Sequence, residues 1–142
     1  MTHMTVINAK NLILGRLASS VAKRALLGES IELVNCEQAV ITGNKKWLIA
    51  RYRQRRERGT PTQGPFFPRQ PERFVKRTIR GMLPYKKELG RAALGRVTCH
   101  VGIPPFLEGK QLETIQEAGI ERLSTTKIVS VKVICHSMGA SQ

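Results

Sequence analysis

A strand, a helix and a second strand follow one another near the start of this sequence, and this unit limits the possible folds. Residues 5–8 form a short β-branched run, and residues 14–27 carry apolar side chains every three or four positions, the period of one helical face. Gly28 suits the end of that helix, and residues 30–35 are typical of a strand. Two strands joined by a helix in so short a stretch are parallel, with a right-handed crossover. The sequence therefore predicts an α/β layer architecture.

The rest of the chain continues with elements of both kinds. Apolar runs predict strands at residues 39–42, 97–101 and 127–129, and the patterns at residues 86–94 and 108–123 predict helices. In the last of these, Glu113, Glu117 and Glu121 recur at four-residue spacing and should face water. Residues 131–138 fit a helix by apolar spacing, with Ser130 as N-cap, but their β-branched content also fits a strand. Residues 140–142 are predicted to be a disordered tail.

Positive charge is concentrated in one segment, residues 44–96, which we call the basic arm. It holds 16 of the 24 Lys and Arg residues but only three of the ten acidic ones, so it carries thirteen of the fourteen net positive charges. A single-sign field on an otherwise ordinary globular composition indicates a polyanionic partner, either a nucleic acid or an acidic membrane surface. Aromatic residues make up only 5% of the chain, so contacts with nucleic-acid backbone and grooves are favoured over stacking on unpaired bases.

The first half of the basic arm predicts a helix with an unusual surface. Trp47 and Tyr52 can anchor it to the body, but five of the eight residues from 51 to 58 are arginines. A helix that is polar on every side, with like charges four residues apart, is poorly stable unless a partner neutralises it. We interpret these arginines as a polyanion-binding surface. The alternative is a frayed, solvated helix end.

The second half of the basic arm is a loop followed by another helix. The Pro-rich loop over residues 59–71 has Phe66 and Phe67 at its centre, which either insert into the protein's own core or form a platform for base stacking. Pro71 suits the first position of the next helix. That helix carries one apolar face and one stripe of four cations over about two turns. The candidate nucleic-acid-binding residues of the whole arm are Lys45, Lys46, Arg51, Arg53, Arg55, Arg56, Arg58, Arg73, Lys76, Arg77, Arg80, Lys86, Lys87 and Arg91.

The sequence contains no complete motif for catalysis, cofactor binding or metal binding. The chain contains no Asp, which removes Asp-based triads and the magnesium-binding Asp of nucleotide hydrolases. The turn after the first strand has only Gly15 where a dinucleotide-binding loop needs three glycines. Cys36, Cys99 and Cys135 are too widely spaced for a zinc site or a disulfide framework. We expect no enzyme activity, cofactor, metal, secretory signal or membrane span, and a soluble protein inside the cell.

Several motifs resemble those of one family, the thirteenth protein of the large ribosomal subunit, in its archaeal and eukaryotic form. They lie within about residues 5–105 and include Gly15-Arg16-Leu17-Ala18-Ser19, Ile41-Thr42-Gly43-Asn44-Lys45, Arg80-Gly81-Met82-Leu83-Pro84 and Gly102-Ile103-Pro104. Asn8 stands where the family is expected to have an Asp.

The resemblance implies a single three-layer α/β/α domain over residues 1–142, with a mostly parallel central sheet and the basic helical arm as an insertion. It also implies a structural and assembly role in the large subunit of the cytoplasmic ribosome, with large-subunit ribosomal RNA and neighbouring ribosomal proteins as partners. No catalysis, small-molecule substrate, membrane or homo-oligomer is expected. The alternatives are an RNA-modifying enzyme and a free-standing regulatory RNA-binding module.

Overall fold

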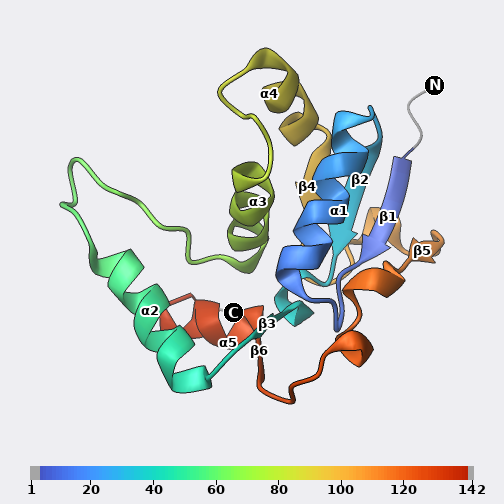
Figure 1. Ribbon diagram of the computed structural model, residues 1–142. Coiled ribbons are helices and arrows are strands. Elements are labelled where there is room, and N and C mark those ends of the chain that lie inside the picture. Colours follow the sequence, from blue (N-terminus) through green and yellow to red (C-terminus); the bar gives the residue numbers. More distant parts are fainter. Residues whose placement is uncertain (1–3, 141–142) are drawn as a thin grey trace.

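The computed structural model describes residues 4–140 and is built on a four-stranded parallel sheet (Figure 1). Its strands are β1 (Met4–Asn8), β2 (Ser30–Val34), β4 (Val97–Cys99) and β5 (Leu112–Glu113), in the spatial order β4-β2-β1-β5. Thr5 lies opposite Ile31 and Ile7 opposite Leu33, so the strand–helix–strand unit predicted from the sequence is confirmed. The α/β fold class and the mostly parallel sheet are confirmed with it.

Helices cover one face of this sheet. Helix α1 (Leu14–Leu26) buries its apolar stripe against the sheet, and α3 (Pro71–Gly81) and α4 (Glu88–Gly95) pack beside it (Figure 1). Ile7, Ile31 and Leu33 point into this layer and are completely buried. Gly28 follows α1 with φ +98°, a conformation that favours glycine. Helix α3 belongs to the basic arm by sequence, but it is also part of the helical layer that covers this face of the sheet.

The opposite face of the sheet has a thinner cover. Val6 and Val34 lie on that face and pack against Leu107 of the short 3₁₀ helix η2 (Pro105–Leu107). On the same face Glu32 of β2 forms an ion pair with His100, whose ring meets Phe106 edge-on at 5.6 Å between centroids. The third layer is thus made by a short turn of helix and its loop.

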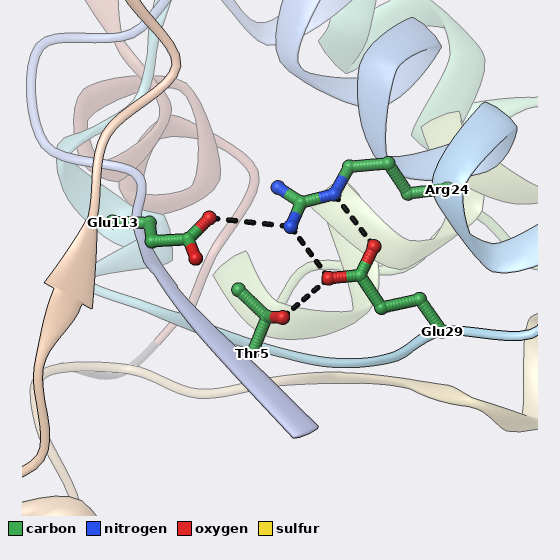
Figure 2. Close-up of polar contacts among 4 residues, drawn as sticks. All are labelled: Thr5, Arg24, Glu29 and Glu113. Atoms are coloured by element: carbon green, nitrogen blue, oxygen red, sulfur yellow. Dashed lines mark hydrogen bonds and ion pairs between the residues drawn. The ribbon is translucent and has the colours of Figure 1, made fainter. Parts of the chain in front are cut away.

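A hydrogen-bonded network ties the end of α1 to the sheet (Figure 2). Arg24, in the last turn of α1, donates from Nε to Glu29 at 2.7 Å and from Nη2 to Glu113 of β5 at 3.2 Å. Glu29 also accepts a hydrogen bond from the Thr5 hydroxyl of β1. The hydrogen bond to Glu29 is the main reason that the pKa of Arg24 is raised. This cation stabilises the body, so it is not part of a surface for partners.

A second, two-stranded sheet pairs two segments that lie far apart in the sequence. Strand β3 (Val40–Thr42) pairs antiparallel with β6 (Ile128–Ser130), and α5 (Val131–Ser137) follows at once. The Ser130 side chain accepts a hydrogen bond from the Val133 backbone N–H, and Gly139 has φ +99° beyond the helix end. The helical interpretation of residues 131–138 is therefore confirmed, because capping at both ends outweighs β-branched propensity. The Ala140 N–H donates to Cys135 O at 3.0 Å, and residues 141–142 lie outside the described part of the chain.

The predicted helix over residues 108–123 is wrong. That segment contains β5 and two short 3₁₀ helices, η3 (Gln116–Ala118) and η4 (Ile120–Arg122). Its internal backbone hydrogen bonds are limited to short turns, and it also bonds to distant residues: the Ile13 N–H donates to Ala118 O at 2.7 Å, and the Ile120 N–H donates to Asn11 O at 3.2 Å. The regular Glu spacing describes only exposed side chains, and no apolar stripe runs beside it. The hydrogen bonds to distant residues therefore determine the structure of this segment.

Candidate nucleic-acid interface

The first helix of the basic arm is α2 (Lys45–Glu57), which lies away from the central sheet beside α5 (Figure 1). The Asn44 side chain caps it by accepting a hydrogen bond from the Lys46 backbone N–H at 3.0 Å. Leu48 is its one fully buried side chain among the described residues. Arg53 Nε donates to Ser137 O at 3.1 Å, at the negative end of α5. The helix is therefore attached to the body at few positions, and most of the rest of its surface is polar or charged, with Trp47 as an exposed exception.

Three aromatic rings connect α2, the Pro-rich loop and α3. Tyr52 lies 5.2 Å from Phe74 and 5.9 Å from Phe67, and Phe67 lies 5.9 Å from Phe74, all measured between ring centroids. Phe74 is buried in the main core, while Tyr52 and Phe67 are half-buried against it. Phe67 thus inserts into the protein, and its neighbour Phe66 does not, since 65% of its surface is exposed. The sequence could not separate the two residues: insertion into the core is confirmed for Phe67 but is wrong for Phe66.

Helix α3 presents the predicted cation stripe, but its four members differ in their surroundings. Arg73 and Arg80 are exposed, whereas Lys76 and Arg77 are half-buried. The Arg77 guanidinium lies 4.5 Å from the centre of the Phe67 ring and donates to Phe66 O at 3.3 Å. Burial lowers its pKa, with smaller contributions from the nearby positive charges of Arg80 and Arg55. Arg77 therefore helps to hold the loop in place, and the other three cations are free to face a partner.

Stacking on aromatic rings fixes several arginines of the arm. Besides Arg77, three guanidinium groups lie over rings: Arg51 over Trp47 at 5.1 Å, Arg55 over Tyr52 at 5.5 Å and Arg80 over Tyr85 at 5.0 Å. All the arginine–aromatic pairs found within residues 4–140 belong to the arm. A guanidinium stacked by its face keeps its edge N–H donors available, in the fork geometry that matches phosphate. The pair formed by Arg80 and Tyr85 could not be predicted from the sequence.

The arm cations have no acidic partners. In the described part of the chain, the ion pairs join Arg24 to Glu29 and Glu113, and His100 to Glu32, all in the body. The remaining predicted residues are distributed along the arm, with Arg55 and Arg56 half-buried and the following ones exposed: Lys45, Lys46, Arg51, Arg53, Arg58, Lys86, Lys87 and Arg91. The Arg56 Nε is buried without a hydrogen-bond partner. The arm therefore concentrates positive charge that the protein itself does not neutralise.

The structure brings part of the predicted set together. The Tyr52 ring of α2 contacts the Phe74 ring of α3, and the positive charge of Arg55 contributes to the lowered pKa of Arg77, so these two helices lie next to each other. Helix α4 lies on the other side of α3 from α2 in Figure 1. Lys86 and Lys87 precede this helix, and Arg91 belongs to it. Arg96, which was not a candidate, donates from Nη1 to Ala25 O at 3.0 Å and stabilises the end of α1.

We also searched residues 4–140 for a metal site, a membrane-spanning helix and a reactive cysteine. No group of three or more His, Cys, Asp or Glu residues in this part of the chain could hold a metal ion. None of the helices described there is both long enough and apolar enough to cross a membrane. The Cys36 and Cys135 thiols are buried, and burial raises the pKa of Cys135 to about 12, so neither is a reactive nucleophile.

Comparison with known proteins connects this geometry to one family. The family model described as ribosomal protein L13 matches residues 2–105. The large ribosomal subunit protein uL13 of Methanosarcina barkeri is 48% identical over 138 residues, covering 96% of this chain and 99% of the relative. The uL13 of Methanocaldococcus jannaschii is 48% identical over 141 residues, covering 96% and 98%. That of Archaeoglobus fulgidus is 47% identical over 136 residues, covering 95% and 87%. The similarity thus extends beyond residues 5–105, where the motifs lie.

Proposed function

This chain belongs to the ribosomal protein L13 family, and from that premise we propose that it binds large-subunit ribosomal RNA through its basic arm and supports assembly of the subunit. Its role in the large ribosomal subunit is structural and not enzymatic. Its partners are ribosomal RNA and neighbouring ribosomal proteins, and its place is the cytoplasmic ribosome. The sheet and α1 form the body that carries the arm.

One observation carries the proposal: the cations of the arm are oriented but not neutralised. Arg51, Arg55 and Arg80 rest on aromatic rings, while no acidic side chain within residues 4–140 pairs with them. Unpaired like charges repel one another and lower the stability of the fold. A surface of this kind gains free energy when a polyanion neutralises it and condensed counterions are released.

The shape of the arm favours RNA over a membrane surface. A membrane-binding helix keeps an apolar face exposed for insertion between lipids. The apolar face of α3 is instead buried, because Phe74, Val75 and Ile79 lie in the protein core. Phosphate groups along RNA helices can contact cations on two protein helices at once, and recognition of folded RNA depends largely on shape.

Sedimentation tests this proposal with the protein in its own cells. The full chain is expressed with a small tag, and lysates are separated on sucrose gradients at high magnesium concentration. The wild type should sediment with large subunits. A variant with Arg51, Arg55, Arg73 and Arg80 changed to Gln should shift to the top of the gradient, and its circular dichroism should show that it remains folded.

A matched control removes four positive charges elsewhere. The exposed body residues Lys10, Lys110, Arg122 and Lys127 are changed to Gln. This control should still sediment with large subunits. Sedimentation of the arm variant with the subunits, at wild-type level, would contradict binding through the arm. Sedimentation of the wild type with messenger RNA complexes alone would instead favour the regulatory-module alternative.

A further inference from the structure

Phe66 occupies an unusual position for a large apolar side chain. It is 65% exposed, although the adjacent Phe67 inserts into the ring cluster with Tyr52 and Phe74. Its position is nevertheless fixed: its carbonyl oxygen accepts a hydrogen bond from Arg77, and its ring lies against Gly64. A Cβ atom on Gly64 would come within 3.0 Å of that ring. Phe66 is therefore an exposed ring on an ordered loop.

The ring forms one wall of a small pocket between the loop and α3. Pro68 and Leu94 complete the apolar part of its lining, and the cations of the α3 stripe form the rest. The pocket has a volume of about 290 Å³. Arg77 is already engaged with the loop, so Arg73, Lys76 and Arg80 are the cations available to an occupant.

We propose that this pocket takes an unpaired nucleotide of the bound RNA, with its base stacked on Phe66 and its phosphates contacted by Arg73, Lys76 and Arg80. This inference deepens the proposed function and rests on it. Nucleobases stack on aromatic side chains through their faces, and the backbone next to an extruded base brings phosphates within reach of cations on the same wall. The low aromatic content of the chain favours backbone contacts in general, and this pocket is one local exception.

A neighbouring protein is the other class of partner that could cover Phe66. The centre of a protein–protein interface is depleted of charged residues. Here the exposed ring is bordered by a helix face that carries Arg73, Lys76 and Arg80 close together. Desolvating these cations against a protein would be costly unless each found an acidic partner, whereas RNA supplies a phosphate at every nucleotide.

Two substitutions at Phe66 separate base stacking from general RNA affinity. Phe66→Leu keeps an apolar side chain of similar size but removes the aromatic face, and Phe66→Tyr keeps the face. Phe106→Leu is the matched control, since Phe106 is 64% exposed and contacts His100 on the opposite face of the sheet. Each variant is titrated against full-length large-subunit ribosomal RNA, and nucleotide flexibility in the complex is mapped by 2′-hydroxyl acylation.

Phe66→Leu should weaken binding by about 5- to 100-fold, the range expected for one lost stacking contact, with an unchanged dependence on salt. At least one unpaired nucleotide should be protected by the wild type and by Phe66→Tyr, and it should stay reactive with Phe66→Leu. Phe106→Leu should match the wild type. Wild-type affinity and an identical protection map for Phe66→Leu would overturn the proposal while leaving RNA binding by the arm intact.

Other outcomes assign the surface differently. If Phe66→Leu binds RNA normally but is lost from purified large subunits, Phe66 contacts a protein neighbour and the nucleotide pocket is excluded. If the wild type itself binds the RNA with no dependence on salt, the proposed function fails together with this inference.

Discussion

Removing three phosphate contacts from α3 should change how RNA affinity depends on salt. The variant carries Arg73→Gln, Lys76→Gln and Arg80→Gln, which leaves the helix-forming tendency of each position nearly unchanged. Arg77 is kept, because it stacks on Phe67 and donates to Phe66 O, so its loss would disturb the loop as well as the charge. The three replaced cations form no ion pair with any acidic residue in the described chain, so the fold should remain stable.

The size of the effect follows from counterion release. Each phosphate neutralised by the protein contributes about 0.7 to 0.9 to the slope of log K against log salt concentration. If each of the three cations meets one phosphate, the slope should become shallower by about two to three units. When the salt concentration rises from 50 to 200 mM, both proteins lose affinity for RNA. The fold loss of the variant should be about 20- to 40-fold smaller than that of the wild type.

The assay is fluorescence anisotropy with the full-length chain and large-subunit ribosomal RNA at several potassium chloride concentrations. A control variant with Lys110→Gln, Arg122→Gln and Lys127→Gln loses the same charge from exposed body positions and should keep the wild-type slope. An unchanged slope in the α3 variant would refute the assignment of this stripe to phosphate contacts. An equal decrease in both variants would show that only net charge matters.

Three further predictions concern the packing and burial of the fold. Gly90→Ala should lower the free energy of unfolding, measured by chemical denaturation, by about 1–3 kcal/mol or more, because the new Cβ would lie 2.0 Å from a backbone oxygen. The control Gly95→Ala places its Cβ in open space and should be neutral or slightly stabilising. Phe74→Ala should cost about 3–5 kcal/mol and lower the melting temperature by more than about 8 °C, since it removes a buried ring from the cluster. In the native protein, iodoacetamide at pH 8 should modify the half-exposed Cys99 first. Burial raises the pKa of Cys135 to about 12, so the reagent should modify Cys135 only after unfolding. Mass spectrometry over time checks the order, and early modification of Cys135 would show that α5 opens readily.

The strand–helix–strand unit could be predicted because its signals are local. The apolar period of α1 is read directly from the sequence, and a helix that connects two neighbouring strands in so short a stretch makes them parallel. Helix α5 was ambiguous by composition but was resolved by Ser130 and Gly139, whose capping roles also depend only on neighbouring residues. Local patterns thus predict local elements well.

Residues 108–123 could not be predicted in the same way. Their backbone is organised by bonds to Asn11 and Ile13, more than 100 residues earlier, and no local pattern reports such contacts. The four-residue Glu spacing predicted a helix because it is the spacing of one helix face, but it describes exposed residues alone. Ala118 is the one buried residue of this segment, and it does not belong to an apolar stripe.

The candidate interface was predicted as a set of charges, but the distinct roles within it needed the structure. The sequence places Arg73, Arg77 and Arg80 on one helix face and gives no reason to separate them. The position of the Phe67 ring makes Arg77 partly structural, and the position of Tyr85 orients Arg80. Adjacent Phe66 and Phe67 likewise differ only because the loop turns one ring into the protein and the other outward.

The claim that the basic arm is the RNA-binding surface is tested most directly by cross-linking within the assembled particle. Large subunits purified from cells that contain this chain are irradiated at 254 nm, digested, and analysed by mass spectrometry for peptides that carry nucleotides. We expect the cross-linked peptides to come from α2, the loop after it, α3 and the segment that leads into α4, within residues 45–91. Cross-links confined to the opposite face of the sheet, around Phe106, with the arm peptides unmodified, would contradict it.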